Sequence, residues 1–310
     1  MSAIVAESLR KAYDGVAAVD GLDLTVAAGE MFGFLGPNGA GKSTTIAMLC
    51  TLTRPDSGHA SVAGFDVVRS STEVRRLIGL VLQESTTDGD LTLMENLRLH
   101  DHLYGLPRRT FPARARHLLD LFGLAERRDR LARTLSGGMR RRLEIVRGLL
   151  HEPAVLFLDE PTAGLDPHSR AGVWDHIHAL RRARPLTVFL TTHHLEEAER
   201  CDRILVLDRG RAAVRGTPEE LKATVHADVV RLNTADDARA AMQIRRDFGC
   251  DATVDAQGVR MVTENGAALV PRLCAVLDTP INAVHVSPPT LDDVFLRHTG
   301  RVVTEGECLQ

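Results

Sequence analysis

The sequence predicts an α/β fold, in which helices cover a mainly parallel sheet, followed by a small C-terminal domain of the α+β class. Short apolar runs of the kind that form strands buried on both faces occur at residues 31–36, 77–83, 154–159, 186–193 and 203–211. Helical stretches lie between these runs, which is typical of a layered parallel sheet. After about residue 225 the pattern changes to a β-α-β-β-α-β order.

The N-terminal strands differ from the later ones. Residues 2–9 and 20–26 alternate enough between apolar and polar side chains to predict strands of a half-exposed sheet. The run at 31–36 ends in glycine and leads into a loop, as a buried strand would. Residues 91–150 show helical spacing and no strand-like run, so we expect a helical subdomain there.

The C-terminal part is expected to form a domain of its own. The order of strand, helix, two strands, helix and strand is expected at 228–233, 235–249, 251–255, 258–263, 266–278 and 281–287. This is the ferredoxin-like order, and a final helix is expected from about Thr290. The predicted domains are 1–222 and 226–310.

The composition excludes several classes of protein. With 310 residues, of which 44% are hydrophobic, the chain can bury a sizeable core, and its net charge of −3 gives no global basic field for nucleic acid. No apolar run approaches the roughly 18–20 residues that span a bilayer, and no signal peptide is apparent. The five cysteines are scattered without a C-x-x-C motif, which indicates reduced thiols in a cytosolic protein.

A glycine-rich loop follows the strand at 31–36. The stretch "GPNGAGKST", Gly36–Thr44, fits the pattern G-x-x-x-x-G-K-[ST] and runs into a helical stretch. Its backbone N–H groups can surround phosphate oxygens, and the positive end of the helix adds to that attraction. Lys42 supplies a cation for the β- and γ-phosphates, and Ser43 supplies a hydroxyl for Mg²⁺.

Two carboxylates end the apolar run at 154–159. Asp159 stands where it can hold Mg²⁺, directly or through water, and Glu160 lies just beyond, nearer the γ-phosphate. We expect Asp159 to be the metal partner and Glu160 to be the base that orients or deprotonates water.

A second anion cradle lies about a hundred residues after the first. In "LSGGM", Leu135–Met139, Ser136 is a good N-cap, and Gly137 and Gly138 leave backbone N–H groups open to an anion. The following run Arg140–Arg142 is interpreted as a solvated helix face in preference to a direct phosphate ligand.

These motifs, in order and spacing, resemble the nucleotide-binding subunits of ABC transporters, and the resemblance covers residues 1 to about 220. It implies a P-loop ATPase fold with an N-terminal antiparallel β portion, hydrolysis of ATP, and ATP and Mg²⁺ as cofactors. Val155–Glu160 matches the Walker B strand with its catalytic glutamate. The nucleotide would be held by the Walker A loop, which comprises Gly36, Pro37, Asn38, Gly39, Ala40, Gly41, Lys42, Ser43 and Thr44.

The resemblance assigns roles to four further residues. Gln83 matches the Q-loop glutamine, which contacts Mg²⁺ and the attacking water, and Tyr13 matches the aromatic ring that stacks on adenine. Asp166 ends a D-loop, and His193 matches the switch histidine that contacts the γ-phosphate, in preference to its neighbour His194.

The resemblance also accounts for the second cradle. Leu135–Met139 is similar to the ABC signature motif, which serves the nucleotide of a second copy when two domains dock head to tail. Ser136, Gly137 and Gly138 would then face the γ-phosphate held by the partner's Walker A loop. Met139 departs from the commonest residue, glutamine, which puts a side-chain contact there in doubt and leaves the backbone cradle unaffected.

Within this family, residues 287–301, "LSGGMRRRLEI" and "LTTHHLEEAE" resemble the daunorubicin-resistance-type exporter ATPases of the ABC-2 class. The resemblance implies a second copy and a separate polytopic permease as partners, no nucleic acid, and a peripheral position on the cytoplasmic face of the membrane. The permease would export a drug, an antibiotic or a lipid-like molecule. An ATPase of a lipid, polysaccharide or uptake transporter is an alternative. A soluble ABC ATPase acting on DNA or ribosomes is disfavoured by the single cassette and the lack of heptads.

Overall fold

The computed structural model describes residues 1–105, 109–225, 228–255, 257–263 and 265–300. The chain divides into two compact units, Met1–Thr217 and Pro218–Gln310. Helix α8 (Pro218–Ala223) therefore belongs to the second unit, whereas the sequence places the boundary at residue 222. In this second unit, Arg297 Nη1 donates to the carbonyl oxygen of Thr224, 2.7 Å away, just after α8.

The central sheet of the first unit has six strands in the order β10-β9-β3-β8-β7-β6. All neighbouring strands are parallel except β9 and β10, which confirms the predicted mainly parallel sheet. Their bounds are β3 (Met31–Leu35), β6 (Ile78–Val81), β7 (Val155–Asp159), β8 (Thr187–Thr192), β9 (Arg203–Asp208) and β10 (Arg211–Gly216).

One predicted strand is confirmed but ends earlier than the sequence predicts. The run at 203–211 is not a single strand, because the chain reverses at Arg209 and Gly210, which both have positive φ (47° and 77°). Strand β10 then returns antiparallel to β9, with Arg211 paired to Asp208. Glycine adopts this backbone conformation without steric cost, so Gly210 favours the tight turn.

A four-stranded antiparallel sheet forms the N-terminal portion, in the order β2-β1-β4-β5. Strands β1 (Ser2–Tyr13) and β2 (Val16–Ala27) are both longer than the sequence predicts. Strands β4 (Ser57–Val62) and β5 (Phe65–Asp66) were not anticipated, because they are short and carry little apolar alternation.

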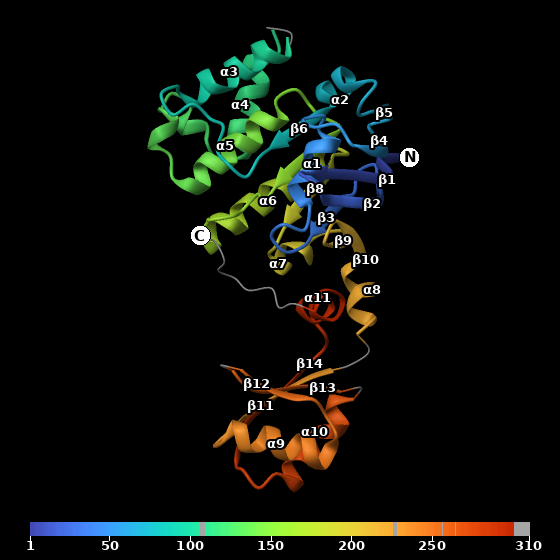
Figure 1. Cartoon of the computed structure of the whole chain (residues 1–310). Helices are drawn as coiled ribbons and strands as arrows, with labels where there is room; N and C mark the ends of the chain where they lie inside the picture. Colours follow the sequence, from blue (N-terminus) through green and yellow to red (C-terminus); the bar gives the residue numbers. More distant parts are fainter. Residues whose placement is uncertain (106–108, 226–227, 256, 264, 301–310) are drawn as a thin grey trace. The chain divides into compact units, whose positions relative to one another are not determined.

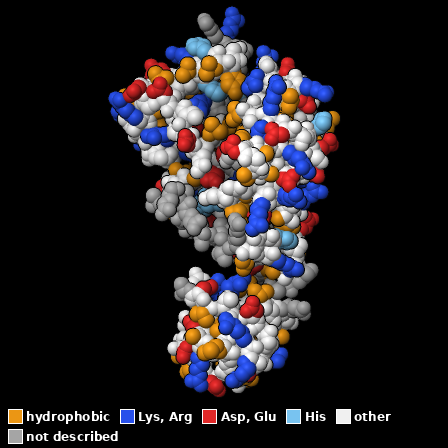
Figure 2. Space-filling view, in the orientation of Figure 1, with side chains coloured by type: hydrophobic (Ala, Val, Ile, Leu, Met, Phe, Trp, Pro, Cys, Tyr) orange, Lys and Arg blue, Asp and Glu red, His pale blue; other side chains and the backbone are white. Residues whose placement is uncertain are grey.

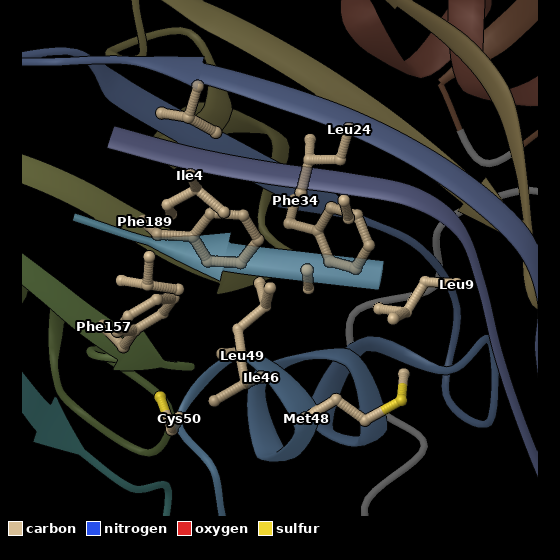
Figure 3. Packing of buried hydrophobic residues seen from close by; sticks show 14 of the residues in the cluster. Ile4, Leu9, Leu24, Phe34, Ile46, Met48, Leu49, Cys50, Phe157 and Phe189 are labelled. Atoms are coloured by element: carbon tan, nitrogen blue, oxygen red, sulfur yellow. The ribbon is translucent and has the colours of Figure 1, made fainter. Parts of the chain in front are cut away.

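A hydrophobic core cluster of the first unit lies between the two sheets and α1 (Lys42–Leu49), as Figure 3 shows. Phe189 of β8 is central to it, since its ring centroid lies 5.7 Å from that of Phe32, 5.3 Å from Phe34 and 5.5 Å from Phe157. Ile46 and Leu49 bring α1 into the same cluster. This packing fixes the helix that carries the Walker A lysine against the strands that carry the acidic residues.

Helices α3 (Leu93–Tyr104), α4 (Phe111–Leu121) and α5 (Gly137–Leu149) gather at one end of the first unit (Figure 1). Short 3₁₀ turns at Ala125–Arg127 and Ala132–Thr134 lead into α5. The remaining helices of this unit are α2 (Ser71–Leu77), α6 (Pro167–Ala183) and α7 (Leu195–Ala198).

The second unit has the predicted ferredoxin-like order. Its sheet is antiparallel throughout, in the order β12-β13-β11-β14. The final helix begins at Leu291, close to the predicted start at about Thr290, and Thr290 caps it by accepting the backbone N–H of Asp293. The elements are β11 (Asp228–Thr234), α9 (Asp237–Phe248), β12 (Ala252–Asp255), β13 (Gly258–Thr263), α10 (Gly266–Val276), β14 (Ile281–Ser287) and α11 (Leu291–Thr299).

The surface carries both signs of charge. On the face drawn in Figure 2, Lys and Arg side chains are interspersed with Asp and Glu. Across the described ranges, no helix combines the length and apolarity needed to cross a membrane. The cysteines are free thiols at Cys50, Cys201, Cys250 and Cys274, while Cys308 lies outside the described residues.

Candidate nucleotide-binding site

The glycine-rich loop connects β3 to α1 and depends on two close backbone approaches. A Cβ added at Gly36 would lie 2.6 Å from the carbonyl oxygen of Leu207. Gly41 has a φ of 105°, and a Cβ there would overlap the carbonyl oxygen of Ala18. Only glycine therefore fits either position, which brings the loop backbone tightly onto the sheet. The first turn of α1 then presents N–H groups that have no intrahelical acceptor.

Lys42 lies beneath this loop and is only 6% exposed. Its Nζ donates to the carbonyl oxygens of Gly36 (2.7 Å) and Pro37 (3.2 Å), and lies 3.8 Å from Oε1 of Glu160. Burial lowers the pKa of Lys42, while the charges of Glu160 and Asp159 raise it. The neighbouring Ser43 and Asn38 are exposed, and Thr44 is half-buried.

The parallel strands bring the other predicted residues to the same edge of the sheet. Leu35 of β3 pairs with Thr192 of β8, so Gly36 and His193 both follow directly. Asp159 of β7 pairs with Thr191. Val81 of β6 pairs with Leu158 of β7, so Gln83 and Glu160 each stand two residues beyond a paired position. The carboxyl ends of parallel strands are where α/β proteins bind their ligands.

The two acidic residues are held differently. Asp159 is 5% exposed, and its Oδ1 accepts a hydrogen bond from the hydroxyl of Thr191. Glu160 has a φ of 46°, and its N–H lies 3.2 Å from the Thr191 carbonyl oxygen and 3.0 Å from the Thr191 hydroxyl. A left-handed backbone at a residue other than glycine is strained, and surrounding contacts must maintain it. Thr191 thus holds both acidic residues, and the sequence analysis did not identify it.

His193 contacts the second carboxylate. Its Nδ1 lies 3.2 Å from Glu160 Oε1, and its ring centroid lies 4.1 Å from that of His194. The interaction with His193 lowers the pKa of Glu160, as do the charges of Lys42 and His194, whereas burial opposes them. Glu160 therefore stays ionised at neutral pH, beside both a lysine and a histidine.

The signature segment begins α5, and Ser136 caps it as the sequence predicts. Ser136 Oγ accepts the backbone N–H of Met139 at 3.3 Å. Gly138 is buried, and a Cβ there would lie 2.6 Å from Oγ of Ser169 in α6. Asp166 caps that same helix by accepting the N–H of Ser169 at 3.0 Å. In the described part of the chain, no hydrogen bond or ion pair joins residues 135–139 to the Walker A loop.

Gln83 and Tyr13 also lie apart from the group formed by Lys42, Asp159, Glu160 and His193. Gln83 is exposed, and its side chain makes no hydrogen bond within the described ranges. Tyr13 is 48% exposed at the end of β1, with Lys11 Nζ 5.5 Å from the centre of its ring.

The interpretation of Arg140–Arg142 as a solvated helix face is wrong for Arg141. That side chain is 7% exposed and donates to the backbone carbonyl oxygens of Asp159, Glu160 and Pro161. The only sequence signal was its spacing to Glu144, since a pair three residues apart shares a helix face.

The fold and the site together define a P-loop ATPase of the ATP-binding cassette type. A family model described as "ABC transporter" matches residues 19–163. The chain is 44% identical over 315 residues to the daunorubicin/doxorubicin resistance ATP-binding protein of Streptomyces peucetius, covering 96% of this chain and 92% of that protein. It therefore belongs to the family of ABC transporter ATP-binding subunits, and it is an ATPase.

Other relatives and solved structures are also ATP-binding proteins of export systems or ABC transporters. The chain is 39% identical to a Nod factor export ATP-binding protein of Ralstonia nicotianae, covering 95% of this chain and 93% of that protein. An ATP-binding subunit of an ABC transporter superposes with a TM-score of 0.65 at 31% identity, covering 71% of this chain and 92% of its own. The cassette MJ0796, a post-hydrolysis dimer bound to ADP and Pi, gives a TM-score of 0.63 at 25% identity, covering 69% and 98%.

Proposed function

We propose that this chain is the nucleotide-binding subunit of an ABC exporter, that it hydrolyses MgATP between two of its own copies, and that it drives a separate membrane permease. The observation that carries the proposal is the contact of Glu160 with both Lys42, at 3.8 Å, and His193, at 3.2 Å, at one edge of the parallel sheet. A carboxylate in this position can receive a proton from water that attacks a phosphate held by the loop.

The roles of the site residues follow from their surroundings. Gly36–Thr44 would bind the phosphates through backbone N–H groups and Lys42. Glu160 would be the general base, with His193 holding its carboxylate and contacting the γ-phosphate. Tyr13 would stack on adenine, since the family places an aromatic ring at this position and the ring is exposed at the end of β1.

The residues present also fit a magnesium ion. Asp159 offers a buried carboxylate oriented by Thr191, and Ser43 offers an exposed hydroxyl at the start of α1, both oxygen ligands of the kind Mg²⁺ prefers. Gln83 would complete the set from the end of β6. When bound, the ion neutralises charge on the phosphate oxygens.

A second copy is proposed because the signature segment does not contact the phosphate loop of its own chain in the described residues. Ser136 and Gly137 are exposed at the positive end of α5, and nothing joins them to the chain's own phosphate loop in the described residues. A head-to-tail dimer would place them, together with Gly138 and Asp166, against the nucleotide of the partner. The dimeric state of the relative MJ0796 supports this arrangement.

The transport role rests on the relatives. Their names include resistance to daunorubicin and doxorubicin and export of Nod factor, and the similarity extends over at least 95% of this chain. We propose a peripheral position on the cytoplasmic face of the membrane, bound to the permease, with residues 1–222 as the ATPase domain and residues 226–310 as an accessory domain. A drug, an antibiotic or a lipid-like molecule is the proposed cargo.

The first experiment is affinity purification of the tagged chain from solubilised membranes of its own host. We expect a stoichiometric polytopic membrane protein to co-purify. The reconstituted pair should then show ATPase activity stimulated by the cargo, with daunorubicin and a lipid-like oligosaccharide tested side by side. Recovery with ribosomes or DNA, and without a membrane protein, would contradict the proposed transport role.

A further inference from the structure

Helix α5 carries a stripe of charged side chains that face inward. Arg141 and Glu144 are 7% and 3% exposed, and Nη1 of Arg141 lies 3.0 Å from Oε2 of Glu144. Arg147, one helical turn further, is half-buried. A buried ion pair is by itself weak evidence for stability. The role of this pair follows from the groups to which the two side chains make their other hydrogen bonds.

All five N–H donors of Arg141 are engaged. Nη2 donates to the carbonyl oxygens of Asp159 (2.8 Å) and Glu160 (3.1 Å), and Nε donates to that of Pro161 (2.7 Å). Nη1 donates to Glu144 and to the carbonyl oxygen of Leu82. One side chain therefore holds three consecutive carbonyls at the end of β7 and one at the end of β6.

The rest of the stripe holds the segment that contains Gln83. Glu144 Oε1 accepts the backbone N–H of Thr86 at 3.1 Å, and Arg147 Nη1 donates to the Thr86 carbonyl oxygen at 2.7 Å. Together with the Leu82 contact of Arg141, these bonds tie α5 to residues on both sides of Gln83.

Glu160 is the residue that needs this support. Its φ of 46° is strained, and Thr191 restrains its N–H. Arg141 restrains its carbonyl and those of both neighbours, so the direction of the Glu160 side chain is set from two sides. A lysine could not reproduce this, because it lacks the planar fork of five donors.

We propose that Arg141 is a positioning residue for hydrolysis, which fixes the main chain of Glu160 and links it through α5 to the signature segment and the Gln83 segment. This inference rests on the proposed role of Glu160 as the base. It differs from a role in nucleotide binding, because Arg141 bonds to no residue of the phosphate loop in the described chain.

The test compares Arg141→Gln and Arg141→Lys with Glu160→Gln and with the double variant Arg141→Gln/Glu160→Gln, all in the full chain. Since a misplacement of about 1 Å costs on the order of 10²-fold, we expect kcat to fall about 10- to 100-fold in Arg141→Gln and less in Arg141→Lys. The Kd for MgATP should stay within about twofold. The double variant should be no slower than Glu160→Gln alone, because Arg141 acts through Glu160.

Arg142→Gln is the matched control. It removes one bond to a carbonyl, that of Phe122 at 3.0 Å, from the same helix, and should keep kcat within about twofold. Normal turnover in Arg141→Gln, or an additional loss in the double variant, would overturn the inference. If Arg141→Gln does not fold, the kcat of Arg141→Lys and of Arg141→Lys/Glu160→Gln is compared in the same way, and normal turnover or an additional loss again overturns the inference. Normal turnover in Glu160→Gln would refute the proposed function itself.

Discussion

At the scale of single residues, the proposed chemistry centres on Glu160. Its side chain is 11% exposed and lies within 4 Å of both Lys42 and His193. Because His193 and the neighbouring charges hold its pKa below the ordinary range, the carboxylate stays ionised as pH falls from neutrality until that lowered pKa is reached. A general base needs this form.

We expect Glu160→Gln to lower the ATPase rate by about 10²- to 10⁴-fold, because glutamine keeps the shape and loses the basic oxygen. ATP should still bind, since the phosphate loop is unchanged, and the variant should accumulate as an ATP-bound dimer. Single-turnover hydrolysis and light scattering after size exclusion measure the two effects. Glu196→Gln, on the exposed start of α7, is the control, and a Glu160→Gln variant with wild-type turnover would exclude this residue as the base.

At the scale of elements, α3 is packed against the chain that follows α5 by a group of rings. The His100 centroid lies 4.5 Å from that of Tyr104, and the Tyr104 ring stacks on His151 at 4.1 Å. His100 Nε2 is buried and has no hydrogen-bond partner within the described residues. Burial, with the charges of His151 and Arg147, lowers the pKa of His100 from 6.5 to about 3.

This shift predicts acid sensitivity of the first unit. The unfolded chain binds a proton at His100 more readily than the folded chain does. The contribution of neutral His100 to the free energy of unfolding is therefore fully present above pH 6.5 and declines as the pH falls toward 3. At about 1.36 kcal/mol per pH unit, the loss at pH 5 is about 2 kcal/mol. His100→Phe should remove this loss, whereas His102→Phe, on the exposed side of α3, should retain it. Urea unfolding at pH 5 and 7.5, followed by fluorescence of the single tryptophan, Trp174, measures the stability of both variants. Equal pH dependence in His100→Phe and wild type would refute the assignment of this acid sensitivity to His100.

At the scale of the whole molecule, the proposed dimer divides each site between two chains. Lys42→Ala damages the phosphate loop. Gly137→Asp places a negative charge at the start of α5, where a Cβ meets only Leu165, at 3.8 Å. Lys42→Ala leaves the signature segment intact, and Gly137→Asp leaves the phosphate loop intact.

Each of these variants alone should be inactive, and an equal mixture should regain activity. Half of the dimers would then be mixed, each with one intact site of two, so recovery should approach about a quarter of the wild-type rate. The measurement is ATPase activity of the mixture against each variant alone. Gly172→Asp, where a Cβ meets no atom within 4 Å, is the control and should be active by itself. A mixture that forms mixed dimers and stays inactive would refute the head-to-tail arrangement.

The sequence by itself determined the features that local patterns encode. The buried strands, the glycine loop before α1, the Ser136 cap, the start of the final helix near Thr290 and the order of the C-terminal elements all depend on residues close together in the chain. The roles assigned to Gln83 and Tyr13 come from resemblance, and they stay predictions. The missed strands β4 and β5 are short, and the reversal at Arg209 and Gly210 was hidden in an apparently continuous run.

Only the tertiary structure decided where the charged and polar side chains of the site find their partners. Arg141 reaches carbonyls 18 to 20 positions further along and Leu82 59 positions before it, and Thr191 meets Asp159 across 32 positions. Such bonds form because parallel strands end at one edge and α5 packs beside them. Periodicity in the sequence indicates which face of an element a residue occupies. The hydrogen-bond partners of that residue depend instead on how elements distant in sequence are aligned with one another.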